Sequence, residues 1–285
     1  MNDTLKVAVI GAGTMGNGIA QVFATHGHDV VLIDVAQEGL DRGLGTIRKS
    51  LDRFVKKEKM TQEETDAIFA RVSGSLDLAA GVAGTDLVVE AVFENEEVKK
   101  SIFRELDAAA PAGCILATNT SSISITSIAS ATARPESVVG MHFMNPVPLM
   151  KLVELIKGEK TSDEVVARTK AIAEAVGKTV GVSEDYAGFV ANRILMPMIN
   201  EAAFTLYEGI ATREDIDTIM KLGMNHPMGP LTLADFIGID VCVNILDYLH
   251  EQFGDPKFRC APNMRRMVEA GKLGRKSGAG FYDYS

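Results

Sequence analysis

The chain has 285 residues, of which 46% are hydrophobic and 24% are charged, an ordinary composition for a folded globular protein. Its net charge of −9 excludes a broad basic surface for nucleic acid, so any recognition of phosphate must be local. The three cysteines (114, 242 and 260) are too scattered for a disulfide framework or a metal cluster, which fits a reducing compartment. We find no secretory signal and no apolar stretch of about 18 residues, and therefore expect a cytoplasmic protein without a membrane partner.

The N-terminal segment alternates strand, turn, helix and strand. Leu5–Ile10 is apolar and β-branched, which predicts a buried parallel strand. A helical pattern ends at Gly27, and a second strand is predicted over Asp29–Ile33. Between the first strand and the helix stand Gly11, Ala12, Gly13, Thr14, Met15 and Gly16. The spacing GxGxxG is a weak signal alone, but in this position it is typical of dinucleotide binding, since the glycines permit a tight turn, close approach of a pyrophosphate and helix–strand packing.

An acidic residue closes the second strand. Asp34 lies 34 − 11 = 23 residues after the first glycine, close to the roughly 20 residues expected in a dinucleotide fold. A carboxylate there accepts hydrogen bonds from ribose hydroxyls and repels a 2′-phosphate. The sequence therefore favours NAD over NADP.

The pattern up to residue 184 predicts an α/β domain with a Rossmann-like, doubly wound sheet. Further apolar strands are expected over residues 87–92, 115–118, 138–142, 152–156 and 179–182, with helical patterns between several of them. Apolar residues recur at helical spacing from Leu40 to Val55, and Thr61 with Glu64 forms a predicted capping box for the next helix.

Residues 185–285 predict a smaller, all-helical domain. Helices are expected over residues 187–207, 213–222, 231–252 and 261–270, the second of them capped by Thr212. Pro197 falls inside the first of these helices. No convincing strand is found in this part of the sequence.

Polar residues follow three predicted strands at the edge where ligands bind in open α/β sheets. Glu94 follows the strand over residues 87–92, residues 119–122 (Asn-Thr-Ser-Ser) follow the next, and the third ends at His142, with Asn145 three residues beyond it. Taken singly, Ser121 is more simply a turn serine and His142 a core histidine. A buried imidazole nevertheless needs a partner or a function, and the joint pattern favours a ligand site.

Several motifs together resemble the L-3-hydroxyacyl-CoA dehydrogenase family, in particular its short-chain bacterial 3-hydroxybutyryl-CoA branch. The glycine-rich turn is shared with many dehydrogenases. More specific are Asn-Thr-Ser-Ser at 119–122, Gly-Met-His-Phe-Met-Asn-Pro-Val-Pro at 140–148 with Lys-Leu-Val-Glu at 151–154, Gly-Phe-Val-Ala-Asn-Arg at 188–193, and Gly-Arg-Lys-Ser-Gly-Ala-Gly-Phe-Tyr at 274–282. The likeness runs in order along nearly the whole chain.

The resemblance implies reversible, NAD-dependent oxidation of an (S)-3-hydroxyacyl-CoA, such as 3-hydroxybutyryl-CoA, to the 3-oxoacyl-CoA, here acetoacetyl-CoA. It implies that His142 is the general acid/base and that Glu154 orients it, with Ser121 and Asn192 holding the substrate oxygen. Implied cofactor contacts are the glycine turn, Asp34, Glu94, Lys99, Ser121, Asn145 and Lys276. Ser50 and Lys57 match positions that contact coenzyme A. The resemblance also implies a homodimer formed through the helical domain.

Two alternatives remain open. One is an NAD-dependent dehydrogenase of a free hydroxy acid or sugar acid on the same scaffold, which preference for the CoA ester would exclude. The other is a non-catalytic NAD-binding dimer, against which the complete set of Ser121, His142, Glu154 and Asn192 argues. A metal enzyme is not expected, because His26 and His28 are the only close pair of histidines and lie in a turn.

Overall fold

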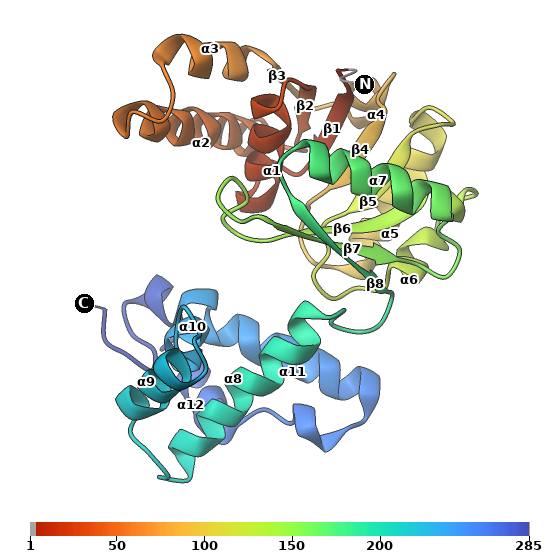
Figure 1. Cartoon of the computed structure of the whole chain (residues 1–285). Helices are drawn as coiled ribbons and strands as arrows, with labels where there is room; N and C mark the ends of the chain where they lie inside the picture. Colours follow the sequence, from red (N-terminus) through yellow and green to blue (C-terminus); the bar gives the residue numbers. More distant parts are fainter. Residues whose placement is uncertain (1–3, 285) are drawn as a thin grey trace. The chain divides into compact units, whose positions relative to one another are not determined.

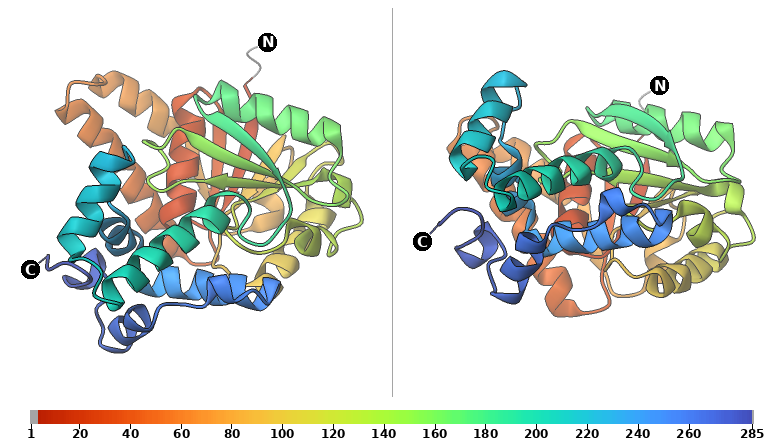
Figure 2. Two further views of the ribbon diagram at one scale, coloured as in Figure 1. Left: turned by 60° about the horizontal axis from the view of Figure 1, so that its bottom comes forward. Right: turned by 90° about the horizontal axis from the view of Figure 1, so that it is seen from below.

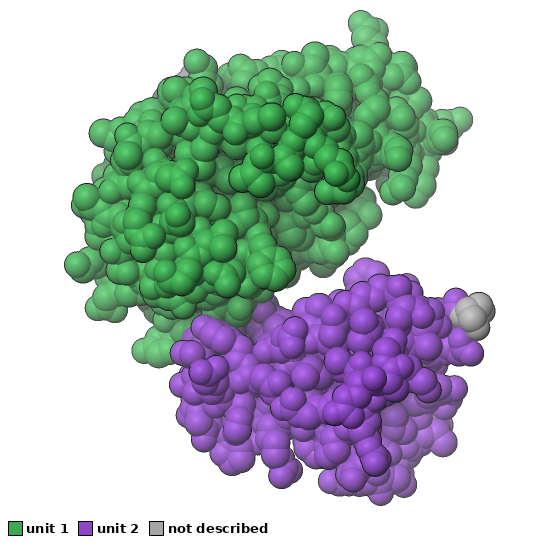
Figure 3. Space-filling view, turned by 180° about the vertical axis from the view of Figure 1, so that it is seen from behind, with its two compact units in different colours: residues 1–186 green, residues 187–285 purple. Residues whose placement is uncertain are grey.

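The computed structural model describes residues 4–284 and divides the chain into two compact units (Figure 3). Unit 1 ends at Tyr186 and unit 2 begins at Ala187, two residues beyond the predicted boundary between 184 and 185. Unit 1 holds the sheet and unit 2 is helical (Figure 1). No helix among the described residues is long and apolar enough to cross a bilayer.

The sheet of unit 1 has eight strands in the order β3-β2-β1-β4-β5-β6-β7-β8. Strands β1 to β6 are parallel, β7 runs antiparallel to β6, and β8 is parallel to β7. The order reverses between β1 and β4, which is the position where open α/β sheets bind ligands. The strands are β1 Lys6–Ile10, β2 Asp29–Ile33, β3 Val72–Ser75, β4 Leu87–Glu90, β5 Ile115–Thr118, β6 Val138–Phe143, β7 Leu152–Lys157 and β8 Thr179–Glu184.

Helices cover both faces of this sheet, as the doubly wound prediction requires (Figures 1 and 2). Alternate residues of β1 point to opposite faces, so Val7 and Val9 join a core with α1, α2 and α7, while α4, α5 and α6 belong to the other face. The helices are α1 Thr14–Thr25, α2 Gln37–Lys56, α3 Gln62–Ala70, α4 Leu78–Val82, α5 Glu96–Ala109, α6 Ile125–Ala129 and α7 Asp163–Ala175. The capping box of α3 is present, with Thr61 accepting from the Glu64 N–H and Glu64 from that of Thr61.

Two details of unit 1 differ from the sequence prediction. Strand β3 was not predicted, because Val72 is the only large apolar residue in its sequence Val-Ser-Gly-Ser, and pairing with β2 creates it. Strand β4 ends at Glu90 rather than at Val92, because the chain turns where the Glu90 side chain accepts from the Val92 N–H at 2.7 Å.

Unit 2 packs five helices around their own apolar core. They are α8 Ala191–Tyr207, α9 Arg213–Gly223, α10 Pro230–Ile237, α11 Ile239–Phe253 and α12 Pro262–Glu269. The prediction of a single helix over residues 231–252 is wrong. The segment forms two helices, α10 and α11, separated at Gly238, whose φ of +108° is incompatible with a helix. Thr212 caps α9, as predicted.

A buried aspartate fixes the C-terminal segment of unit 2. Asp235 is 1% exposed, and its carboxylate accepts from the N–H groups of Phe281 and Tyr282 at 2.8 and 2.9 Å and from the Tyr284 hydroxyl at 3.0 Å. The motif at residues 274–282 is therefore held in place by hydrogen bonds within its own unit.

Candidate active site

The glycine-rich turn joins β1 to α1 and has the close contacts that its spacing predicts. Gly11 has a φ of +95°, and its N–H donates to the Ile33 carbonyl at 2.8 Å. A Cβ at Gly16 would lie 1.7 Å from the Gly11 oxygen, so no larger residue fits. Around Gly13, by contrast, a Cβ would meet nothing within 4 Å. The turn therefore leaves open space beside the N-terminus of α1, where a phosphate group fits.

Asp34 lies beside this turn at the end of β2. Its carboxylate accepts from the Ala12 N–H at 2.9 Å and from the Ala36 N–H at 3.1 Å. The two bonds hold the side chain at the carboxyl end of the sheet, in the position expected for a group that binds ribose hydroxyls.

A cavity of about 1240 Å³ opens at the point where the strand order reverses. Its walls follow β1, β2 and β4 and include Gly11, Gly13, Asp34 and Phe93. Phe93 is 81% exposed, so a flat apolar surface faces the cavity rim. A large apolar cavity that meets a glycine turn and one carboxylate fits a dinucleotide.

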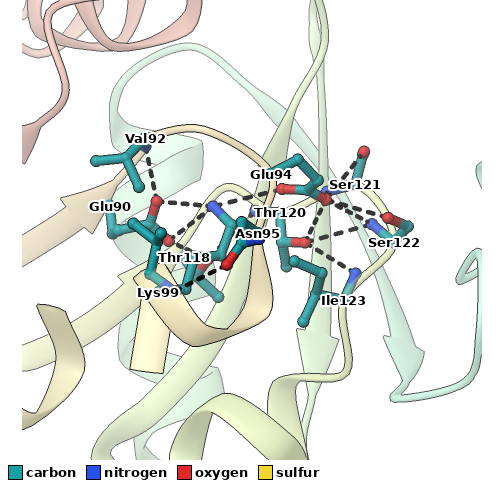
Figure 4. Close-up of polar contacts among 11 residues, drawn as sticks. Glu90, Val92, Glu94, Asn95, Lys99, Thr118, Thr120, Ser121, Ser122 and Ile123 are labelled. Atoms are coloured by element: carbon teal, nitrogen blue, oxygen red, sulfur yellow. Dashed lines mark hydrogen bonds and ion pairs between the residues drawn. The ribbon is translucent and has the colours of Figure 1, made fainter. Parts of the chain in front are cut away.

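Glu94 organises the loop after β5 (Figure 4). Its Oε1 accepts from the Thr120 hydroxyl at 2.6 Å, from the Ser121 N–H at 2.9 Å and from the Ser122 N–H at 3.2 Å. The Ser121 hydroxyl also lies 3.3 Å from this oxygen. Burial raises the pKa of Glu94, but the Lys99 charge and these hydrogen bonds outweigh it, so the pKa is below its usual value. Glu94 is therefore a carboxylate that positions Ser121.

Lys99 lies beneath Glu94 and is 1% exposed. Its ammonium donates to both oxygens of the buried Glu90, at 2.7 and 3.0 Å, and lies 3.4 Å from Glu94. Thr118 donates to Glu90 at 2.7 Å (Figure 4). In this arrangement Lys99 supports the loop from below, and a direct contact with cofactor stays a prediction.

His142 and Glu154 form a buried pair on neighbouring antiparallel strands. The β6–β7 register sets the two residues directly opposite each other, and His142 Nδ1 lies 3.1 Å from Glu154 Oε2. They are 7% and 5% exposed. Because the partner atom is a carboxylate oxygen, Nδ1 is the donor, which leaves Nε2 as the acceptor nitrogen of a neutral ring.

The segments around His142 are tied to their neighbours. The Phe143 N–H donates to Asn119 Oδ1 at 2.8 Å, which joins β6 to the end of β5. Farther along, the Lys178 ammonium donates to the carbonyls of Val147 and Met150 at 2.6 and 2.7 Å. Asn145 is exposed between these two anchors.

The remaining predicted site residues lie on other elements than the sheet edge described above. Ser50 and Lys57 are at the far end of α2, where Ser50 is half-buried and Lys57 is exposed. Asn192 and Lys276 belong to unit 2: Asn192 is 8% exposed in α8, and the Lys276 ammonium contacts both carboxylate oxygens of Asp240, at 2.6 and 2.7 Å.

Sequence reasoning missed the support of the Glu94 loop. Glu90 stands in an apolar strand, and a charge in such a run is a signal for a buried partner, which Lys99 provides at i+9. No pattern in the sequence indicated the structural roles of Thr118 and Lys178. No group of three or more potential metal ligands occurs among residues 4–284.

The fold and this site define a dinucleotide-binding dehydrogenase. Comparison with known proteins gives the family. The model for "3-hydroxyacyl-CoA dehydrogenase, NAD binding domain" matches residues 6–186, and that for "3-hydroxyacyl-CoA dehydrogenase, C-terminal domain" matches residues 188–284. The chain therefore belongs to the 3-hydroxyacyl-CoA dehydrogenase family, and the resemblance found in its motifs is confirmed.

Individual relatives match over nearly their full length. A probable 3-hydroxybutyryl-CoA dehydrogenase of Deinococcus radiodurans is 54% identical over 98% of this chain and 100% of its own. The 3-hydroxybutyryl-CoA dehydrogenase of Bradyrhizobium diazoefficiens is 53% identical, over 98% and 95%. The crystal structure of (S)-3-hydroxybutyryl-CoA dehydrogenase PaaH1 from Ralstonia eutropha has a TM-score of 0.95 and 48% identity and covers 99% of this chain and 100% of that one.

Proposed function

We propose that this protein catalyses the reversible, NAD-dependent oxidation of (S)-3-hydroxyacyl-CoA, with 3-hydroxybutyryl-CoA and acetoacetyl-CoA as its substrate pair. The observation that carries the proposal is the buried His142–Glu154 pair, at 3.1 Å, at the ligand edge of a sheet that also has the dinucleotide turn. The names of the relatives support the CoA ester as substrate.

In this proposal His142 takes the proton from the substrate 3-hydroxyl through Nε2. Glu154 accepts from Nδ1, fixes the tautomer and stabilises the imidazolium that forms. The pair is buried, so its mutual attraction is weakly screened by water. In the reducing direction the imidazolium returns the proton to the 3-oxo group.

Ser121 and Asn192 hold the substrate oxygen and stabilise the charge that develops on it. Glu94 positions Ser121 through the loop after β5. When bound, NAD would supply the hydride acceptor for the substrate carbon, and NADH would supply the hydride in the reverse direction. The glycine turn, Asp34, Glu94, Asn145 and Lys276 would hold NAD, with Lys99 acting through Glu94. Ser50 and Lys57 would hold the phosphate-bearing end of coenzyme A.

The initial rate of NADH loss tests this proposal. We expect rapid turnover with acetoacetyl-CoA and NADH, and at least tenfold slower turnover with either free acetoacetate or NADPH. Free acetoacetate lacks the coenzyme A group, and NADPH carries a 2′-phosphate that Asp34 repels. Turnover with NADPH would contradict only the inference, drawn from Asp34, that the protein prefers NAD over NADP. Equal turnover of free acetoacetate would indicate the free-acid enzyme, and NADH binding without turnover the non-catalytic dimer.

We also propose that unit 2 forms a homodimer. Its exposed apolar side chains support this, among them Ile219, Leu222 and Met224 on and after α9, which are 58%, 79% and 59% exposed. Leu222→Glu is expected to shift a dimer to monomer in sedimentation velocity, because it inserts a charge into an apolar contact. Val182→Glu, at a half-exposed site in unit 1, is the matched control and should leave the dimer intact. A wild-type monomer at micromolar concentration would contradict the proposal.

We assign the protein to the cytoplasm. Its three cysteines are free and buried. Burial raises the pKa of Cys242 to about 12 and that of Cys260 to about 11, so both thiols are protonated and unreactive at neutral pH. Such thiols suit a reducing compartment.

A further inference from the structure

The loop after β5, residues 119–124, carries Ser121 and is held by two carboxylates. Glu94 holds its first part, as described above (Figure 4). The last residue of the loop, Ser124, has a different partner, because its hydroxyl donates to Asp185 Oδ2 at 2.7 Å. Asp185 has no role in the site as described so far.

Asp185 makes three hydrogen bonds to the end of this loop and the start of α6. Besides the Ser124 hydroxyl, its Oδ1 accepts from the Ile125 N–H at 3.0 Å and its Oδ2 accepts from the Thr126 N–H at 2.7 Å. Asp185 is half-buried, so water competes little for these donors. Hydrogen bonds to an ionised carboxylate are stronger than those between neutral groups, so Asp185 fixes the chain at this point.

The contact joins distant parts of the sheet. Asp185 directly follows β8, whereas the loop follows β5, and β6 and β7 lie between these two strands (Figure 1). The Asp185 N–H donates to the Lys157 carbonyl at the end of β7, at 3.0 Å. The Glu159 N–H, just beyond β7, donates to the Thr126 hydroxyl oxygen at 3.0 Å. The end of the loop is therefore anchored to the last two strands of unit 1.

The loop is compact, so a shift at its end reaches Ser121. Only two residues separate Ser121 from Ser124. Within the loop, the Ile123 N–H donates to Thr120 Oγ1 at 2.9 Å, and the Ser122 N–H donates to the same oxygen at 3.3 Å. These bonds link the part held by Glu94 to the part held by Asp185.

We propose that Asp185 is a positioning residue for the reaction: it fixes the end of the loop after β5 and so places the Ser121 hydroxyl beside the substrate oxygen. The inference rests on the proposed function, because Ser121 holds the substrate oxygen only in that reaction. Asp185 acts through Ser121, so its contribution belongs to turnover. Binding of NADH depends mainly on the glycine turn and Asp34, which lie on other segments of unit 1.

Asp185→Asn tests this role, because an amide has one acceptor oxygen and cannot serve both backbone N–H groups. We expect kcat for acetoacetyl-CoA reduction to fall about 10- to 100-fold, the cost of misplacing a catalytic group. The KM for acetoacetyl-CoA and the Kd of NADH should change little. The stoichiometry of NADH binding should stay the same and shows that the variant is folded. If Asp185→Asn does not fold, Ser124→Ala takes its place, since it removes only the hydroxyl contact.

Asp107→Asn is the matched control. Asp107 is also half-buried, and it accepts from the Ala133 N–H at 2.7 Å and from Arg134 Nε at 3.0 Å, in the segment after α6. The control should therefore lower stability without slowing turnover. Amide hydrogen exchange gives a readout that needs no substrate: exchange over residues 119–126 should be faster in Asp185→Asn and unchanged in Asp107→Asn.

Three results would overturn the inference. One is an unchanged kcat in Asp185→Asn, and a second is an equal loss of kcat in Asp107→Asn, which would indicate general damage around α6. The third is a loss that is as large in a Ser121→Ala background as in the wild type, because a residue that acts through Ser121 has little effect once that hydroxyl is gone. Failure of the proposed function looks different: the wild-type protein would not reduce acetoacetyl-CoA, while hydrogen exchange would still show whether Asp185 holds the loop.

Discussion

Replacing His142 with glutamine is expected to lower kcat for acetoacetyl-CoA reduction by about 10²–10⁴-fold, the range that general acid–base catalysis contributes. Glutamine is similar in size and can still donate to Glu154, so the carboxylate does not lose its partner. It has no group that exchanges a proton near neutral pH. The fold, checked by the thermal unfolding midpoint, and NADH binding, checked by fluorescence titration, should both change little.

Glu154→Gln separates the acid/base from the residue that orients it. The variant keeps a side chain of the same shape opposite His142 but loses the charge that stabilises the imidazolium, so we expect a smaller loss of kcat than in His142→Gln. A loss at Glu154 that equals or exceeds the loss at His142 would mean that the two roles are reversed.

The order of strands and helices was largely predictable because the sheet is buried on both faces. Strands such as β1 and β5 are then continuous apolar runs, bounded by glycine or polar residues. The failures occur where this signal is absent. Strand β3 forms only by pairing with β2, and the break at Gly238 depends on one backbone angle inside a continuous apolar pattern.

The residues of the site could be predicted from the sequence, but the contacts between them could not. The carboxyl ends of parallel strands meet at one edge, so Glu94 and Ser121, which follow β4 and β5, and His142, near the end of β6, could be grouped from the sequence. The pairing of His142 with Glu154 depends on the register of the β6–β7 hairpin, and a slip of one residue would turn Glu154 to the opposite face of the sheet. Spacing alone does not determine that register, and the resemblance to a known family provided the pair.

Glu90→Gln is expected to lower the free energy of unfolding by about 3–5 kcal/mol, although Glu90 was not among the predicted functional residues. Glu90 and Lys99 are 0% and 1% exposed, and removing Glu90 leaves the buried Lys99 ammonium with only its longer contact to Glu94, at 3.4 Å. The bonds to Thr118 and to the Val92 N–H would also weaken. Urea denaturation measures the loss. Glu38→Gln is the control, because the Glu38–Arg42 pair is exposed and its loss should cost under about 1 kcal/mol.

The double variant Glu90→Gln/Lys99→Met distinguishes the buried charge from general damage to the core. If the ammonium without its partner causes the loss, replacing it with an apolar side chain of similar length should restore part of the stability. We also expect weaker NADH binding in Glu90→Gln, and the double variant should not restore it, because Lys99 lies 3.4 Å from Glu94, which positions the loop of Ser121. Recovery of both properties would mean that Lys99 only balances Glu90. Recovery of neither would mean that the packing of β4 itself, rather than the charge, requires Glu90.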